Sequence, residues 1–341
     1  MSEPIKFPTP EMPVARKNPA ERLLVLAASD MAAVDSLITD RMQSPVGIIP
    51  DLAAHLVSAG GKRLRPLLTV ASAAMCGYQG QDHHKLAAAV EFIHSATLLH
   101  DDVVDESELR RGKRPANKIW GNASSILVGD FLFAGAFNLM VETGSMEALS
   151  VLSKASSVIA EGEVKQLAYL RKITVTEADY MDIIRAKTAA LFAAATEVAP
   201  IIAERSTAER AALRDYGMKI GLAFQLVDDA LDYGGMESAL GKSVGDDFRE
   251  GKVTLPVIRA YQQAGHVEKA FWNRVVVEHV QTDTDLETAV SYLRAAGTLQ
   301  STLEQARKYA DDARQALSIF PKSNLRSTLG DLAGYVVDRI N

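Results

Sequence analysis

Apolar residues recur at helical spacing in one long stretch after another, from about residue 20 to the end of the chain. No stretch alternates apolar and polar residues as a half-buried strand would, and no segment of about 20–50 residues repeats. No Gly/Ser-rich linker divides the chain. We therefore expect an all-α fold with one large helical domain over residues 20–341, although 341 residues alone would suggest about two domains.

The apolar spacing also predicts where the helices lie. The expected helices cover about residues 20–42, 47–59, 65–76, 83–105, 122–142, 146–170, 176–203, 206–235, 253–264, 267–281, 284–296, 299–317 and 324–340. Two loops rich in charge and glycine, residues 106–121 and 235–252, separate some of them. Both loops directly follow the most unusual motifs in the chain, so we expect them to close over a ligand or to be simple charged loops.

Composition excludes several classes of protein. The chain carries 37 Lys and Arg against 43 Asp and Glu, and this net charge of −6 argues against a protein that binds the phosphate backbone of nucleic acids. Only 6% of the residues are aromatic, which leaves few rings for stacking on bases. The single cysteine, Cys76, excludes an internal disulfide framework and a Cys-rich metal site.

The first 19 residues differ from the rest because they hold five of the twelve prolines and no apolar run. We expect residues 1–19 to form a disordered or surface-wrapped tail, and they do not resemble a signal peptide. Further along, Asp130, Glu197 and Pro200 interrupt the most apolar stretches. We therefore expect no transmembrane segment and a cytoplasmic location.

Two clusters of aspartates share the pattern D-D-x-x-D, and each ends a long apolar stretch. The first consists of Asp101, Asp102 and Asp105, and the second of Asp228, Asp229 and Asp232. In a helix the first and last members of each cluster share a face, because residues i and i+4 are neighbours. The middle members, Asp102 and Asp229, are turned about 100° away.

These clusters need a counter-charge. Like charges at i and i+4 cost roughly 0.2–0.5 kcal/mol each, and carboxylates near a helix C-terminus oppose its dipole. Mg²⁺ prefers carboxylate ligands and commonly bridges them to substrate phosphates. Two clusters in matching surroundings therefore favour a pair of Mg²⁺ sites on one diphosphate, while two solvated helix ends remain the simpler alternative.

Several basic residues occur where a phosphate group would explain them. Lys62 and Arg65 lie in Gly60-Gly61-Lys62-Arg63-Leu64-Arg65-Pro66 at an expected helix start, where cations oppose the dipole unless an anion binds there. His94 falls on the same helical stripe as the first aspartate cluster. Arg110 and Arg111 follow in the first charged loop. A solvated basic turn, a core histidine and a charged loop are the alternatives.

Polar residues also occur within apolar helices and near the second cluster. Lys187 and Thr188 lie in an otherwise apolar stretch, and Gln225 precedes the second cluster by three positions. Each buried polar group requires a partner, which can be structural or a ligand. Lys252 ends the second charged loop.

Together these residues resemble the trans-isoprenyl diphosphate synthases, particularly the long-chain polyprenyl diphosphate synthases of octaprenyl and decaprenyl type. The matching segments, in the order of the family, are Gly61–Pro66, Leu99–Asp105, Arg110–Gly112, Gly129-Asp130, Lys187-Thr188, Phe224–Asp232 and Gly251–Pro256. They span about residues 60–256, and neither aspartate cluster departs from the family pattern.

The resemblance implies an activity and a set of site residues. It implies a helical bundle around a deep central cavity, usually a homodimer, that condenses isopentenyl diphosphate head-to-tail with an allylic diphosphate and uses Mg²⁺. The implied principal Mg²⁺ ligands are Asp101, Asp105 and Asp228, supported by Asp102, Asp229 and Asp232. The implied isopentenyl diphosphate site is Lys62, Arg65, His94 and Arg111; the implied allylic site is Arg110, Lys187 and Lys252, with Thr188 and Gln225 near the reacting carbons.

Product length depends on the residues that precede the first cluster. In short-chain members of the family, bulky aromatic residues at these positions block the cavity. Here Ala96 and Thr97 are small, and Ile93 continues the same helix below them. We expect an open tunnel and a long product, which would serve as a quinone side chain; a geranylgeranyl or farnesyl product is the alternative.

Three rival functions fit the sequence less well. A class I terpene cyclase also uses D-D-x-x-D, but its second metal motif usually mixes Asn, Ser or Thr, and Glu. A di-iron protein would require a second Glu-x-x-His besides Glu91-x-x-His94, and none occurs. A non-catalytic synthase subunit generally lacks the aspartates that this chain keeps.

Overall fold

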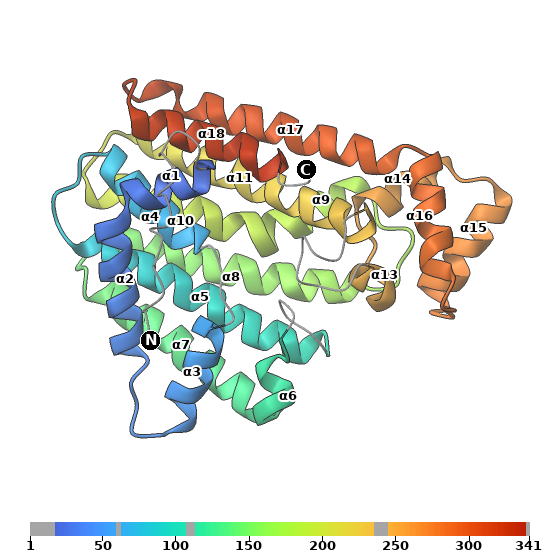
Figure 1. The fold of residues 1–341 in the computed structure, drawn as a ribbon, viewed down its shortest axis with the longest axis horizontal. Helices are drawn as coiled ribbons and strands as arrows, with labels where there is room; N and C mark the ends of the chain where they lie inside the picture. The colour runs from blue at the N-terminus through green and yellow to red at the C-terminus, as the bar shows by residue number, and fades with distance from the viewer. Residues whose placement is uncertain (1–17, 59–62, 107–112, 235–244, 339–341) are drawn as a thin grey trace, which may run out of the picture.

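The computed structural model describes residues 18–58, 63–106, 113–234 and 245–338. All the regular structure in these ranges is helical, without a β-strand, which confirms the all-α prediction (Figure 1). The α-helices are α1 (Pro19–Leu26), α2 (Ala28–Arg41), α3 (Ile48–Ser58), α4 (Leu64–Met75), α5 (Asp82–Val104), α6 (Ala116–Trp120), α7 (Asn122–Val141), α8 (Met146–Tyr169), α9 (Glu177–Ile184), α10 (Ala190–Ile202), α11 (Thr207–Gly234), α13 (Asp246–Glu250), α14 (Leu255–Gln263), α15 (His266–Trp272), α16 (Asp285–Ala295), α17 (Thr298–Ala316) and α18 (Asn324–Asp338).

The expected helices occur close to their expected positions, with a few differences. Residues 20–42 form two helices because the chain breaks at Ala27, where the backbone is not helical (φ −106°, ψ 14°). Short helices α6 and α13 lie within the two expected loops. Most of the expected N-terminal tail, residues 1–17, lies outside the described residues. Pro19, which we assigned to that tail, is instead the first residue of α1, capped by the Asn18 side chain.

Long helices lie side by side and enclose the main core. α11 packs against both α10 and α17, and α5 packs against α7 and α4 (Figure 1). A second, smaller core surrounds the fully buried Trp272 and joins α14, α15 and α16. Val253 contacts both clusters of buried residues, so the segment after α13 connects the two cores.

A π-helical segment, Arg185–Ala189, joins α9 to α10, and its last two residues, Thr188 and Ala189, are buried. A second π-helical segment, Asn273–Val277, follows α15. Two glycines allow other helices to approach the first segment closely. A Cβ atom on Gly162 of α8 would lie 2.8 Å from the Lys187 backbone nitrogen, and one on Gly221 of α11 would lie 2.6 Å from the Ala189 Cα. Larger residues would therefore push α8 and α11 away from this segment.

α7 is the described helix whose length and apolar composition would allow it to cross a membrane. However, 39% of its most apolar window is buried against the protein, and it packs along α5. One such helix is equally typical of a protein core, so we draw no membrane assignment from it. Phe131, Phe133 and Phe137 are partly buried against the main core, whereas the apolar side chains of Ile126, Leu127 and Val141 are exposed.

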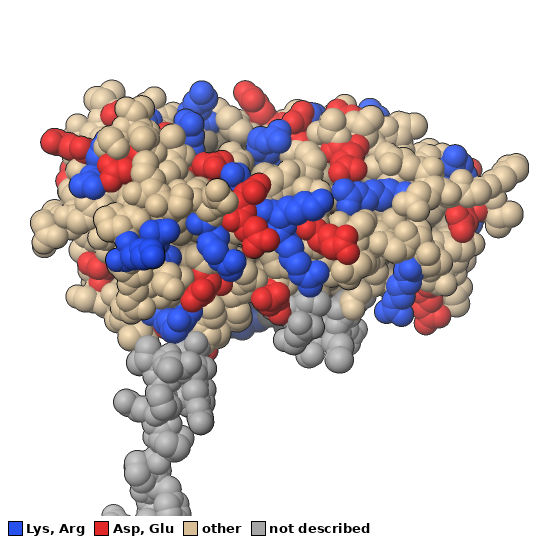
Figure 2. Space-filling view, turned by 90° about the horizontal axis from the view of Figure 1, so that it is seen from above, with Lys and Arg blue, Asp and Glu red and all other residues tan. Residues whose placement is uncertain are grey.

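Charges on the face formed by α17 and α18 are mixed. Lys and Arg side chains alternate with Asp and Glu across the described surface seen from this side (Figure 2). Ion pairs such as Arg22 with Asp331, 2.6 Å apart, account for part of this mixing. This face does not present the single-sign field that steers a polyanion.

Candidate active site

A cavity of about 840 Å³ lies between α4, α5, α8, α9, α10 and α11. Both charged and apolar groups line it. The acidic lining residues are Glu91, Asp101, Asp105, Glu163, Asp228, Asp229, Asp247 and Asp338, and the basic ones are Arg63, Arg65, Lys187 and Lys252. The two aspartate clusters, 127 positions apart in the sequence, therefore meet at one cavity.

The first aspartate cluster lies where α5 ends. Asp101 and Asp105 line the cavity, and each faces a lysine. Lys252 Nζ lies 3.0 Å from Asp105 Oδ2, and Lys187 Nζ lies 3.8 Å from Asp101 Oδ2. Asp102 is turned away and is 1% exposed, so it does not line the cavity.

The second cluster contributes to the cavity through its first two members. Asp228 and Asp229 line it. Asp229 accepts hydrogen bonds from the Tyr180 hydroxyl (2.5 Å) and from Gln225 Nε2 (2.7 Å). The Thr188 hydroxyl donates to Gln225 Oε1 over 2.7 Å. The two polar residues that we expected near the reacting carbons thus belong to one hydrogen-bonded chain ending on Asp229.

Asp232, the last member of the second cluster, has a different position. It does not line the cavity. Its carboxylate accepts hydrogen bonds from the backbone amides of Asp246 (3.2 Å) and Asp247 (3.0 Å) at the start of α13. Asp232 therefore fixes the segment that precedes Lys252, and it supports the cavity from outside.

The charges in the cavity perturb one another. Burial, then the nearby Asp101, raises the pKa of Glu163 to about 7. Burial and the charge of Asp247 raise the pKa of Asp229 to about 8, against the opposing hydrogen bonds from Tyr180 and Gln225. Burial alone would lower the pKa of Lys187, but Asp101 and Glu163 raise it. The lysine is therefore fully charged at neutral pH.

A basic group lies near the start of α4. Arg65 and His94 both line the cavity, and Arg65 Nη1 lies 3.1 Å from His94 Nε2. The Arg65 guanidinium also stacks 4.3 Å from the centre of the Phe192 ring. Lys62, Arg110 and Arg111, the other expected phosphate contacts, lie outside the described residues.

Comparison with known proteins connects this arrangement to a family. The polyprenyl synthetase family model matches residues 47–293. The chain belongs to the polyprenyl synthetase family. It is 45% identical to the octaprenyl diphosphate synthase of Escherichia coli K12, over 94% of this chain and 98% of that one.

Solved structures of family members have a similar fold. A polyprenyl synthase from Caulobacter crescentus CB15, complexed with calcium and isoprenyl diphosphate, is 56% identical with a TM-score of 0.92, over 94% of this chain and 98% of that one. A decaprenyl diphosphate synthase from Rhodobacter capsulatus is 53% identical with a TM-score of 0.90, over 94% and 99% of the two chains. The resemblance inferred from the motifs is therefore confirmed, including its long-chain branch.

The structure places the three expected tunnel residues on two sides of α5. Thr97 lines the cavity. Ile93 and Ala96 are fully buried in the main core and do not line this cavity, so their part in a product tunnel stays a prediction. Helical phase explains why Ala96 lies away from the cavity: it is turned roughly 160° from the stripe shared by His94, Asp101 and Asp105.

Two residues of the cavity were missed in the sequence. Glu163 on α8 accepts a 2.7 Å hydrogen bond from Lys187 Nζ, and Tyr180 on α9 holds Asp229. Neither belongs to a motif, because each meets its partner only after distant helices have packed. The buried Lys187, which needed an acidic partner, was the one signal pointing to a residue such as Glu163.

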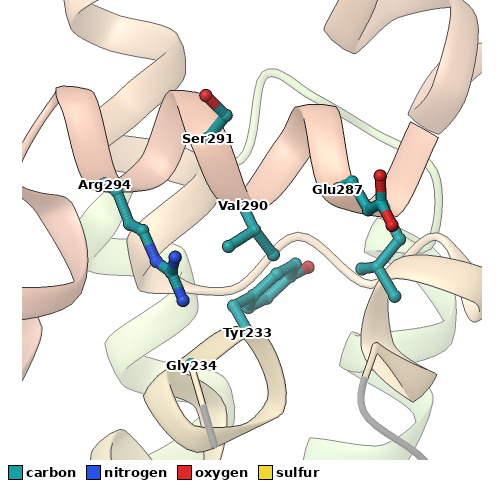
Figure 3. Close-up of a pocket in the computed structure, with 7 residues that line it drawn as sticks. Tyr233, Gly234, Glu287, Val290, Ser291 and Arg294 are labelled. Atoms are coloured by element: carbon teal, nitrogen blue, oxygen red, sulfur yellow. The ribbon is translucent and has the colours of Figure 1, made fainter. Parts of the chain in front are cut away.

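A second hollow, of about 420 Å³, lies between the end of α11 and α16 (Figure 3). Val290 of α16 and Tyr233 at the end of α11 point toward each other there, and Arg294 lies to one side (Figure 3). None of the expected site residues lines it. Catalysis is therefore assigned to the larger cavity.

Proposed function

We propose that this protein is a prenyltransferase that condenses isopentenyl diphosphate head-to-tail onto an allylic diphosphate to make a long-chain all-trans polyprenyl diphosphate. The observation that carries the proposal is the meeting of both aspartate clusters with Lys187 and Lys252 at one cavity. Its octaprenyl and decaprenyl diphosphate synthase relatives support the long product.

The donor set fits a hard divalent cation. Asp101, Asp105 and Asp228 offer carboxylate oxygens to one cavity, and oxygen is the ligand that Mg²⁺ prefers. The relative crystallised with calcium and isoprenyl diphosphate supports such a site. We infer that these three residues hold Mg²⁺, with Asp229 beside them and Asp102 and Asp232 supporting from outside the cavity. When bound, Mg²⁺ would neutralise charge on the leaving diphosphate.

Basic residues divide between two diphosphates. Lys187 and Lys252, with Arg110, hold the allylic diphosphate beside the aspartates. Arg65 and His94, with Lys62 and Arg111, hold isopentenyl diphosphate near the start of α4. Charged donors of this kind stabilise the negative charge that grows on the leaving group as the allylic carbon becomes cationic.

The other residues that line the cavity would protect the allylic cation from water. Thr188 and Gln225 lie on the hydrogen-bonded chain that ends on Asp229. We infer that they stabilise the cation near the reacting carbons. Apolar groups such as Leu98, Phe192 and Phe224 exclude water from the hydrocarbon. The double bond of isopentenyl diphosphate attacks the cation, and we infer that the released diphosphate accepts the proton that then leaves, because the aspartates would be occupied by Mg²⁺.

The test is incubation of the purified protein with labelled isopentenyl diphosphate, an allylic primer and Mg²⁺, followed by chromatography of the dephosphorylated products. We expect products of about octaprenyl to decaprenyl length, and none without divalent metal. No elongation with any primer would overturn the proposal, and cyclic products would favour a terpene cyclase.

We also propose that the protein is a homodimer that uses the exposed side of α7, and that it is cytoplasmic. Leu127 and Val141 are 67% and 63% exposed on that helix, and Ile126 adds to the same apolar surface. Exposed apolar surface of this kind is typical of subunit interfaces. Light scattering after gel filtration should give twice the chain mass, and Leu127→Arg should shift it toward one chain mass. A wild-type monomer would contradict the dimer without affecting the proposed reaction.

A further inference from the structure

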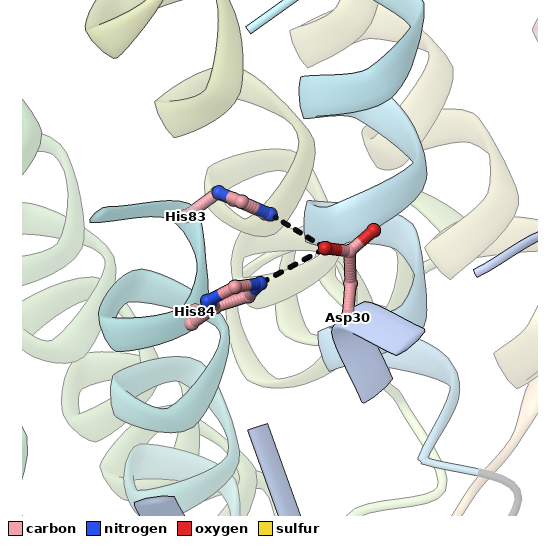
Figure 4. A group of neighbouring side chains, drawn as sticks. All are labelled: Asp30, His83 and His84. Carbon is pink, nitrogen blue, oxygen red and sulfur yellow. Dashed lines mark hydrogen bonds and ion pairs between the residues drawn. The ribbon is translucent and has the colours of Figure 1, made fainter. Parts of the chain in front are cut away.

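Three potential metal ligands that do not line the cavity converge where α2 meets the start of α5. Asp30 on α2 faces His83 and His84, the second and third residues of α5 (Figure 4). Asp30 Oδ1 lies 3.3 Å from His83 Nε2 and 3.0 Å from His84 Nε2. The two imidazole rings lie side by side, with centroids 4.0 Å apart. The three ligand atoms lie within 4.8 Å of one another.

We propose that Asp30, His83 and His84 bind a borderline divalent cation of the zinc type. Two ligands of one tetrahedral ion, with bonds of about 2.1 Å, lie roughly 3.4 Å apart. The separations from Asp30 to the two histidines are already close to that value. Small movements of the side chains would therefore make room for an ion between them.

The donor types distinguish this site from the aspartate clusters. Imidazole nitrogen suits Zn²⁺, Co²⁺, Ni²⁺ and Cu²⁺, whereas oxygen ligands suit Mg²⁺. The distance also separates the two, because Asp101 follows His83 by 18 positions along α5, or roughly 27 Å. The new site is thus chemically and spatially independent of the proposed reaction.

Burial and access suit a bound ion. The His83 side chain is 9% exposed, whereas Asp30 is 38% exposed and leaves a path from solvent. With three protein ligands, a fourth position stays open for water or another ligand. An ion there would connect α2 to α5, the helix that carries the first aspartate cluster, and would stabilise the docking of the N-terminal helices.

The experiment measures Zn²⁺ and Co²⁺ binding to the full chain after treatment with a chelator and its removal. Isothermal titration with Zn²⁺, in buffer containing millimolar Mg²⁺, should give one site that His84→Gln weakens at least tenfold. Co²⁺ should give the strong visible absorption of a tetrahedral nitrogen-containing site. Zn²⁺ should raise the Tm by a few degrees in the wild type.

Asp30→Asn separates metal binding from structure, because the amide oxygen still accepts the histidine hydrogen bonds but lacks the carboxylate charge. We expect it to lose the Zn²⁺ site and to keep the Tm of the chelator-treated wild type. His266→Gln, an exposed histidine elsewhere, and Asp101→Asn, in the cavity, should both keep the site. Equal Zn²⁺ affinity in the wild type and in His84→Gln and Asp30→Asn would overturn the proposal.

Discussion

The two aspartate clusters have the same sequence pattern but different surroundings. In the first, Asp101 and Asp105 both line the cavity and face lysines from other segments. In the second, Asp228 lines the cavity, Asp229 is held by Tyr180 and Gln225, and Asp232 caps α13. Each cluster thus has two members at the cavity and one outside it, but the outside member is the buried middle residue Asp102 in the first cluster and the last residue, Asp232, in the second.

Their positions on the helices explain the difference. α5 ends at Val104, so Asp105 lies at the helix end, beside the cavity. α11 continues to Gly234, so the second cluster lies within its last turns and is packed against α9 and α13. The same D-D-x-x-D sequence can thus have different contacts, depending on which helices pack against its aspartates.

The largest effect is expected from the first cluster. Asp101→Asn should lower kcat/KM by about 10³-fold, or ~4 kcal/mol, because the cavity loses a carboxylate proposed to hold the Mg²⁺ that would neutralise charge on the diphosphate. Steady-state kinetics at saturating Mg²⁺ would measure it. Asp312→Asn, at an exposed position on α17, serves as the control and should stay near wild type. A loss smaller than tenfold in Asp101→Asn would remove this residue from the metal site.

In the second cluster, we expect the loss to be concentrated at its first member. Asp228→Asn should lower kcat/KM by about 10²-fold, because Asp101 and Asp105 still supply carboxylates to the same cavity. The same kinetic assay, repeated across Mg²⁺ concentrations, should show a raised Mg²⁺ requirement. Equal losses for Asp228→Asn and Asp232→Asn would contradict the division of labour inferred above.

Much of this arrangement could be predicted from local spacing. The i, i+4 relation correctly placed Asp101 and Asp105 on one face, and apolar periodicity located the long helices. The π segment around Lys187 could not be predicted, because it depends on how closely α8 and α11 approach. The role of Asp232 was equally hidden, since it needs the position of α13, a helix within an expected loop.

Resemblance and geometry gave different answers for the tunnel. Small residues before the first cluster implied a tunnel wall at both Ala96 and Thr97, yet helical phase directs these side chains to different sides of α5. His94, Asp101 and Asp105 share one side of α5, and the same helical spacing places Ala96 on the opposite side. Local periodicity was the more reliable guide to this cavity.

Product length can test which side of α5 the growing chain follows. Thr97→Phe should shorten the main product by one or more isoprene units, because a ring would fill part of the cavity that Thr97 lines. Chromatography of dephosphorylated products would show it, with Thr97→Val as the control of similar volume. An unchanged product length in Thr97→Phe would show that the growing chain does not pass Thr97. If Ala96→Phe also shortened the product, the tunnel would include residues beyond those that line the cavity.

Tyr180→Phe tests the structural half of the second cluster through stability. Burial raises the pKa of Asp229 to about 8, and the Tyr180 hydroxyl opposes that rise. A raised carboxyl pKa makes the folded state lose stability as pH rises, until the folded pKa is passed. Without the Tyr180 hydroxyl the pKa of Asp229 should rise further, so the folded state should go on losing stability up to a higher pH. The difference in unfolding free energy from wild type should therefore be constant between pH 6 and about 8 and widen above it.

Urea unfolding at several pH values measures this difference. At neutral pH we expect Tyr180→Phe to cost about 1–2 kcal/mol, from one lost buried hydrogen bond. Tyr261→Phe, at a partly exposed tyrosine on α14, is the matched control and should show no widening. A difference that stayed constant up to pH 9 would mean that Tyr180 does not hold the Asp229 charge.

The smallest effect is expected from Asp232→Asn. This variant keeps one acceptor oxygen but loses the charge that the α13 amides bind, which should cost about 1 kcal/mol of stability, as for a helix cap. Because Asp232 does not line the cavity, kcat/KM should fall by less than tenfold, through a less well fixed Lys252. A rise in KM for the allylic diphosphate at nearly constant kcat would identify this indirect route. A loss as large as that of Asp101→Asn would instead make Asp232 a ligand and the two clusters equivalent.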